Sequence, residues 1–156
     1  DDLIDGGSGD DYIDGSTGSD DLRGGRGDDR MSGWWGDDIF RFDYGDGIDT
    51  VSEESGNDAI IFGPGITQEM ISMVRLGGSA LQIDIDGGAG GQIIVDSQFD
   101  NGGGIEELRF DDGSIIDLAM QAFVTQGTAG DDQILGIRYG GSSEDTIFGG
   151  EGNDTL

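Results

Sequence analysis

The feature that most constrains this chain is an aspartate that recurs every nine residues through the N-terminal part. The aspartates are Asp2, Asp11, Asp20, Asp29 and Asp38. A large apolar residue follows two positions after each, and a glycine-rich tetrad such as Gly24-Gly25-Arg26-Gly27 precedes most of them. In register the unit reads G-G-x-G-x-D-x-U-x, where U is a large apolar residue. A short, fixed period of this kind indicates a solenoid in which every unit packs against its neighbours.

The first six residues of a unit predict a turn, and the last three predict a strand. In a three-residue strand the middle side chain faces one way and its neighbours the other, so each unit sends one apolar residue inward. Successive units alternate between two sides, and every second turn therefore stacks on the same side. One buried apolar side chain contributes about 2 kcal/mol, whereas ordering nine residues costs on the order of 10 kcal/mol. The unit therefore needs a further source of stability.

The charge of the chain indicates what that source is. The net charge is -27, from 34 acidic and 7 basic residues, and the chain holds 33 glycines. Composition alone would predict disorder, but the regular spacing argues against it. Calcium prefers several hard oxygen ligands in a tolerant geometry, whereas magnesium demands a stricter octahedron. The repeat thus favours calcium binding, which would also relieve the repulsion between carboxylates.

The composition also excludes several classes of function. The chain has no cysteine and no histidine, which excludes disulfides, thiolate or imidazole metal sites and histidine-dependent catalytic triads. Its acidity argues against nucleic acid as a partner, and no stretch is long and apolar enough to span a membrane. We therefore expect no catalysis within these residues, and any catalytic domain would lie outside them.

The cadence predicts three regions along the chain. Residues 1–61 form an N-terminal repeat block, in which the cadence slips by two after about residue 41 and continues through degenerate, terminating repeats. Residues 62–126 form a β-rich intervening module with its own apolar face. Residues 127–156 return to the repeat with an insertion. Both ends of the sequence fall within a unit, so we expect a segment of a longer repetitive protein.

Within the intervening module, alternating apolar residues predict short strands. The first two span Ile71–Arg75 and Leu81–Ile85, with a hairpin turn at residues 77–79. Further strands are expected within 92–99 and 107–110.

These residues carry a family resemblance. The units resemble the RTX calcium-binding repeats of bacterial proteins exported by type I secretion. The middle, from Ile60-Ile61-Phe62-Gly63 to Asp111-Asp112-Gly113, resembles the haemolysin-type calcium-binding-related domain. Asp38-Ile39-Phe40-Arg41-Phe42 is similar to the D-x-F-x-F step that closes such blocks. The resemblance implies an all-β fold, a right-handed parallel β-roll split by a small β-rich module, with roughly four or more calcium ions between same-side turns.

The resemblance also implies a ligand set. The carboxylates are Asp2, Asp11, Asp20, Asp29, Asp38, Asp132, Asp145 and Asp154. The backbone carbonyls are those of Gly7, Gly9, Gly18, Gly25, Gly27, Gly36, Gly150 and Gly152. Further metal candidates are Asp10, Asp28, Asp49 and Asp58. Ser16 and Trp34 depart from the pattern, because each stands where the second glycine of the tetrad is expected.

Together these features predict a calcium-binding module, unfolded at low calcium and folded outside the cell, from a secreted or cell-surface bacterial protein that uses type I secretion machinery. The alternatives are an adhesin segment that binds a glycan or protein, or an accessory module of an extracellular enzyme. Trp34 and Trp35 either stack on a sugar or cap the roll where it ends. The pairs Glu53-Glu54 and Glu106-Glu107 are expected on solvated faces.

Overall fold

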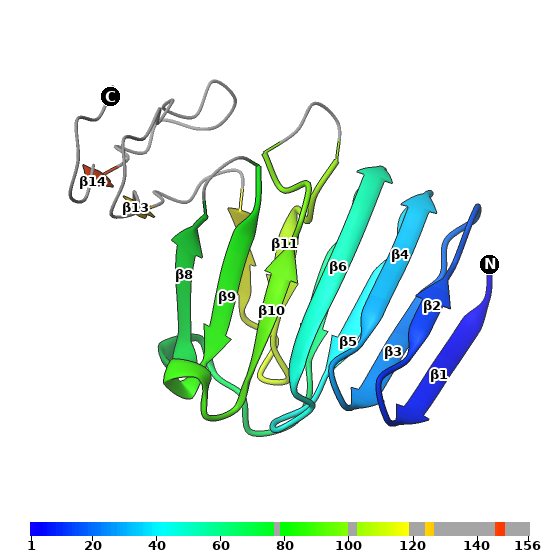
Figure 1. Ribbon diagram of the computed structural model, residues 1–156, viewed down its shortest axis with the longest axis horizontal. Coiled ribbons are helices and arrows are strands. Elements are labelled where there is room, and N and C mark those ends of the chain that lie inside the picture. The colour runs from blue at the N-terminus through cyan, green and yellow to red at the C-terminus, as the bar shows by residue number, and fades with distance from the viewer. Residues whose placement is uncertain (77–78, 100–102, 119–123, 127–145, 149–156) are drawn as a thin grey trace.

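The computed structural model describes residues 1–76, 79–99, 103–118, 124–126 and 146–148 (Figure 1). The regular elements of this part of the chain are β-strands, joined by turns, with two short 3-10 turns, η1 (Gln68–Met70) and η2 (Asp86–Gly88). No helix among the described residues has the length and apolar character needed to cross a bilayer.

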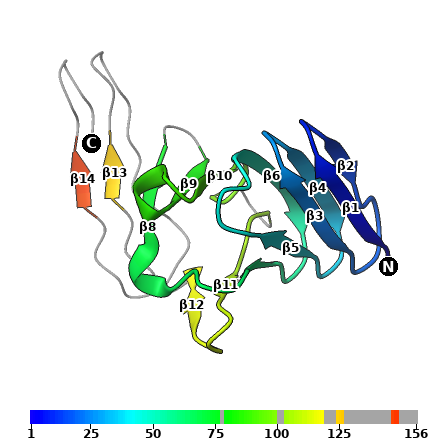
Figure 2. The same cartoon turned by 90° about the horizontal axis from the view of Figure 1, so that it is seen from below.

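Consecutive strands of the repeat block enter opposite sheets. One sheet holds β1 (Leu3–Ser8), β3 (Asp21–Arg26), β5 (Ile39–Phe42) and β7 (Ala59–Phe62). The other holds β2 (Tyr12–Asp14), β4 (Arg30–Trp35) and β6 (Ile48–Ser55). Neighbours in each sheet pair in parallel, and Figure 2 shows the two layers. The chain is therefore a parallel β-solenoid, which confirms the predicted all-β parallel roll.

The pairing register follows the nine-residue unit. Leu22 lies beside Ile4 and Phe40 beside Leu22, one full coil apart. From β4 to β6 and from β5 to β7 the offset grows by two residues, so that Met31 lies beside Val51. The two extra residues of the sequence are thus absorbed in the turn before β6, and the inward-facing apolar positions stay in phase.

The core of the roll is a stack of the residues at position U. Ile13, Leu22, Met31, Phe40, Val51 and Ile60 are between 0 and 4 % exposed. Parallel in-register pairing places each of them against its counterpart in the next coil of the same sheet, so the stack is continuous. Each of these side chains contributes about 2 kcal/mol through burial.

The intervening module extends both sheets. β8 (Ile71–Arg75), β9 (Leu81–Ile85) and β10 (Gly91–Val95) form an antiparallel meander whose last strand pairs in parallel with β6. β11 (Glu107–Arg109) pairs in parallel with β7, and β12 (Ile115–Asp117) closes that edge. The strands predicted from the alternating pattern are therefore present.

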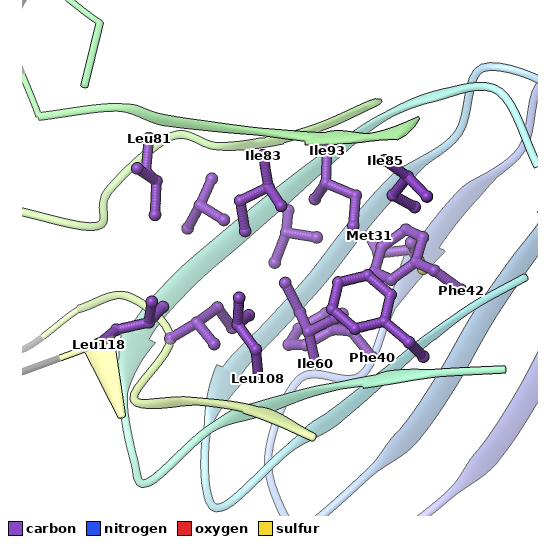
Figure 3. Packing of buried hydrophobic residues seen from close by; sticks show 14 of the residues in the cluster. Met31, Phe40, Phe42, Ile60, Leu81, Ile83, Ile85, Ile93, Leu108 and Leu118 are labelled. Carbon is purple, nitrogen blue, oxygen red and sulfur yellow. The ribbon is translucent and has the colours of Figure 1, made fainter. Parts of the chain in front are cut away.

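The apolar face of the module packs onto the core of the roll. Leu81, Ile83, Ile93 and Leu108 belong to the same buried cluster as Phe40 and the other repeat residues (Figure 3). The shared core extends beyond residues 42–61, where the repeat units end, into the module. The last coil of the repeat block is covered by the module, and one core runs through both.

The remaining described strands are β13 (Val124–Gln126) and β14 (Thr146–Phe148), which pair in parallel with each other. β13 also joins β8 through Thr125 and Arg75. Trp34 and Trp35 lie in β4, which has β6 beside it, so they do not cap the end of the roll.

Candidate metal centre

The repeat aspartates end the turns and form two rows, one on each side of the roll. The first row is Asp2, Asp20, Asp38 and Asp58, and the second is Asp11, Asp29 and Asp49. Neighbours within a row are 18 residues apart, or 20 where the turn has two extra residues. The five members Asp20, Asp29, Asp38, Asp49 and Asp58 are only 1–2 % exposed. Asp11 is partly buried and Asp2 is exposed, because they belong to the first coils of the chain.

One carboxylate oxygen of each buried aspartate is held by the backbone of the preceding coil. The N–H of Asp11 donates to Oδ1 of Asp29 at 2.8 Å, and the N–H of Asp20 donates to Oδ1 of Asp38 at 2.7 Å. The same bond joins Asp38 to Asp58 at 2.8 Å. These charge-assisted bonds fix the carboxylates in one orientation along each row.

In four of these five aspartates, Asp20, Asp29, Asp38 and Asp58, the other carboxylate oxygen is buried without a hydrogen-bond partner. Among the described residues, the buried side-chain oxygens without a hydrogen bond are Oδ2 of Asp11, Asp20, Asp29, Asp38 and Asp58 and both oxygens of Glu53. An ionised carboxylate removed from water without a partner is strongly unfavourable. Aligned, unpartnered, hard oxygen donors are what a calcium ion binds, so these residues fit the metal implied by the repeat.

The backbone of the first glycine of each tetrad lies directly beside the unpartnered aspartate oxygens. A Cβ atom on Gly6 would lie 2.7 Å from Oδ2 of Asp11 and 2.8 Å from the carbonyl oxygen of Gly24. A Cβ atom on Gly15 would lie 2.7 Å from Oδ2 of Asp20. The first glycine of each tetrad lacks a side chain where the free carboxylate oxygen lies. At Gly6 the carbonyl oxygen of Gly24 lies beside the same position. Any larger residue would fill this position.

The fourth glycine of the tetrad allows the turns to stack. Gly36 has a φ of 133° and a Cβ atom built on it would collide with the carbonyl oxygen of Gly18 in the preceding coil. The tight stacking brings each row of carboxylates together.

Burial raises the pKa of the carboxyls toward the module. It raises the pKa of Asp49 and of Asp58 to about 7 and that of Glu53 to about 8, with further increases from neighbouring carboxylates. The pKa values of Asp38 and Asp46 are also raised, mainly by burial. The site therefore favours either bound protons or a bound cation over bare negative charge.

Glu53 is a residue that the sequence analysis placed incorrectly. It was expected on a solvated face, yet it is 3 % exposed, while Glu54 beside it is exposed. One oxygen from each of Asp38, Glu53 and Asp58 lies within 4.8 Å of the others. Counting back five residues from Asp58 gives Glu53, just as counting back from Asp38 gives Gly33. That alignment singles out Glu53, because the earlier units on the same side have glycine there, at Gly15 and Gly33.

The structure places the other predicted residues as follows. Asp49 and Asp58 continue the two rows, whereas Asp10 and Asp28 are exposed and lie outside them. The six glycines in the described part that were expected to offer carbonyls all have positive φ: Gly7, Gly9, Gly18, Gly25, Gly27 and Gly36. Ser16 and Trp34 take up the same left-handed conformation, with φ of 68° and 72°. Asp132, Asp145, Asp154, Gly150 and Gly152 lie outside the described residues.

Two family models match the chain. The RTX calcium-binding nonapeptide repeat matches residues 1–21, 14–51 and 139–156. The haemolysin-type calcium binding protein related domain matches residues 81–120. The repeat and the intervening module are thus recognised separately, in the arrangement that the resemblance predicted.

Two known proteins are similar to the chain. Iron-regulated protein FrpA of Neisseria meningitidis serogroup C is 36 % identical over 101 residues, which cover 62 % of this chain and 8 % of that protein. The crystal structure of extracellular lipase LipA from Serratia marcescens matches 88 % of this chain and 22 % of the lipase with a TM-score of 0.53 at 22 % identity. The chain therefore spans only a small part of either protein, and the lipase shows the fold alone.

Proposed function

Because the chain carries RTX calcium-binding nonapeptide repeats and a haemolysin-type calcium-binding-related domain, we propose that it is a calcium-triggered folding module of a secreted bacterial protein. The observation that carries the proposal is the alignment of buried, unpartnered Oδ2 atoms along the two aspartate rows. When bound, calcium supplies the positive charge and the coordination that these oxygens lack. The repeat aspartates and the carbonyls of the loop glycines are the proposed ligands.

The same residues oppose folding when no cation is present. The chain carries a net charge of -27, and folding places the carboxylates of each row close together and out of water. The 33 glycines add to the conformational entropy lost on folding. At low calcium the unfolded chain keeps its carboxylates solvated and apart, which makes it the favoured state.

Calcium outside a cell reverses this balance. Extracellular calcium-binding modules have dissociation constants of roughly 10⁻⁴ to 10⁻³ M. At ten times the dissociation constant, one site stabilises the folded state by about 1.4 kcal/mol, and several sites add together. An unfolded chain in the calcium-poor cytosol also suits passage through a narrow export channel, as in type I secretion. In this proposal the chain is not itself an enzyme, and it acts outside the cell or at its surface.

Circular dichroism of the whole chain tests the proposal. In excess EDTA we expect a spectrum without the β signal, and in millimolar calcium the full β signal. Magnesium at the same concentration should restore little of it, because magnesium keeps its water and requires a strict octahedron. An unchanged β signal in EDTA would exclude calcium-triggered folding.

The alternative function, glycan recognition, has one observation in its favour. Trp35 is 53 % exposed, and its ring centroid lies 6.4 Å from that of Trp34. A glycan array in calcium, repeated with Trp35→Ala, distinguishes the two functions. A hit that the variant loses would support glycan binding, whereas calcium-dependent folding should survive the substitution because the ring is half exposed.

A further inference from the structure

Glu53 introduces a carboxylate where the repeat has a glycine. It is the first residue of the tetrad Glu53-Glu54-Ser55-Gly56, a position that Gly33 occupies in the preceding coil of the same side. Glu53 is 3 % exposed, and although the backbone N–H groups of Gly33 and Glu54 lie near enough to offset part of the rise in its pKa that burial causes, neither of its side-chain oxygens makes a hydrogen bond of normal geometry. A buried glutamate with both oxygens free calls for a ligand, since an unsatisfied buried carboxylate is costly.

The side chain points into a space that two repeat aspartates already border. A Cβ atom on Gly33 would collide with Oε1 of Glu53 and with Oδ2 of Asp38, so both oxygens face that glycine. One oxygen each of Asp38, Glu53 and Asp58 lies within 4.8 Å of the others. Oxygens bound to one calcium at 2.3–2.6 Å can be separated by up to about 5 Å. The spacing therefore permits all three carboxylates to bind a single ion.

Within the described part of the chain, no ion pair compensates this cluster. The ion pairs within the described residues involve Arg23, Arg41, Arg109 and the N-terminus, and none includes Asp38, Glu53 or Asp58. Three carboxylates close together without a cation would repel one another strongly in a buried site. A divalent or trivalent ion is the partner that this arrangement fits.

The intervening module holds the cluster in place from the other side. The N–H of Asp58 donates to Oε2 of Glu106 at 2.6 Å. The hydroxyl of Ser97 donates to the carbonyl oxygen of Glu53 at 2.7 Å, which fixes the backbone that carries the glutamate. The cluster is thus built at the junction of the last repeat coil and the module, and not in a mobile loop.

We propose that Asp38, Glu53 and Asp58 form a three-carboxylate calcium site at this junction, at the module end of the first aspartate row, in which a glutamate side chain replaces the first glycine of the tetrad and adds a third carboxylate to the two repeat aspartates. The inference rests on the proposed function and adds a specific residue and site to it. More negative ligands strengthen calcium binding. The junction site is therefore the tightest of the sites in the described part of the chain.

The test compares Glu53→Gln with the matched control Glu54→Gln, which removes the same charge from the exposed neighbour. Calcium binding to the whole chain is measured by isothermal titration. Terbium, a hard trivalent ion that prefers oxygen ligands as calcium does, is titrated in parallel. The chain has two tryptophans, Trp34 and Trp35, which are the two residues after Gly33. Terbium emission on tryptophan excitation therefore reports on this part of the roll.

We expect Glu53→Gln to lose the tightest binding step, or to weaken it at least about tenfold, and to lower the tryptophan-sensitised terbium signal. Glu54→Gln should match the parent in both. If Glu53→Gln fails to fold, Glu53→Gly gives the same test, because it restores the residue type that the earlier coils have at this position. Equal stoichiometry and affinity in parent and Glu53 variants would overturn the junction site alone. A parent chain that binds no calcium would overturn the proposed function as well.

Discussion

Asp49→Asn should have opposite effects on the stability of this chain with and without calcium. The carboxyl of Asp49 is 2 % exposed, and its Oδ1 accepts the N–H of Asp29 at 2.9 Å. Asparagine can keep that hydrogen bond through its carbonyl oxygen while removing the charge. Only the electrostatic contribution of the residue therefore changes.

The magnitude follows from the pKa. Burial, with repulsion from Asp29 and Asp46 added, raises the pKa of Asp49 from 3.8 to about 7. A folded-state pKa above the unfolded value means that the folded chain binds the extra proton. The stability that protonated Asp49 gives the folded state, relative to the ionised form, is therefore fully present below about pH 4 and is lost as the pH rises through 7. A difference of about three pH units corresponds to roughly 4 kcal/mol. In EDTA at pH 8, Asp49→Asn should recover a penalty of that order.

The assay is folding in EDTA, driven by a stabilising osmolyte and followed by circular dichroism at pH 5 and pH 8. The parent should fold at lower osmolyte concentration at pH 5 than at pH 8, and Asp49→Asn should reduce that difference. In calcium the variant should be less stable than the parent, because a ligand candidate is gone. Asp111→Asn, in the exposed turn between β11 and β12, is the control. It should change neither the pH dependence of folding in EDTA nor the stability in calcium. A variant no more stable than the parent at pH 8 in EDTA would refute the reasoning.

Three further predictions concern the folded, calcium-loaded chain and are measured by urea unfolding. Gly36→Ala should lower the free energy of unfolding by more than 2 kcal/mol, because its Cβ atom would collide with the carbonyl oxygen of Gly18. Gly45→Ala, with a φ of 85° and open space around it, should lower it by only about 1 kcal/mol. Equal losses would show that strain alone acts at both positions. Ser16→Gly should stabilise by about 0.5–1 kcal/mol, the left-handed penalty of about 1–2 kcal/mol less the added chain entropy of glycine; a loss would mean that the serine side chain is needed. Leu22→Ala, at a position 0 % exposed, should cost about 2–5 kcal/mol, and Leu3→Ala, at a position 81 % exposed, less than about 0.5 kcal/mol.

The nine-residue cadence predicts the roll in considerable detail. It places Leu22, Met31 and Phe40 inward and puts same-side units one coil apart, and the structure confirms both. The slip of two residues is also visible in the sequence and reappears as the changed register between β5 and β7. These features could be predicted because they depend on local spacing and on strand geometry alone.

The burial of Glu53 could not be predicted in the same way. In sequence it belongs to a degenerate unit near the end of a block, where an acidic pair is most simply exposed. Its burial depends on β10 pairing with β6 and on Ser97 and Glu106 reaching the last repeat turn. Those contacts join residues 44 and 48 positions apart. The repeat count shows that Glu53 replaces a glycine, but no short period records these contacts, so its burial is visible only in the folded chain.

The two carboxylate oxygens of the buried repeat aspartates have different roles, and these roles explain why aspartate suits the position. In Asp20, Asp29, Asp38 and Asp58, Oδ1 accepts an N–H from the preceding coil, which sets the orientation of the carboxylate, and Oδ2 is left without a partner. A ligand oriented before an ion arrives loses little entropy when it binds. The bond that orients Asp38 comes from the backbone of Asp20, which is itself oriented by Asp2. Folding of one coil therefore prepares the metal ligand of the next, and metal binding and the growth of the roll are coupled along each row.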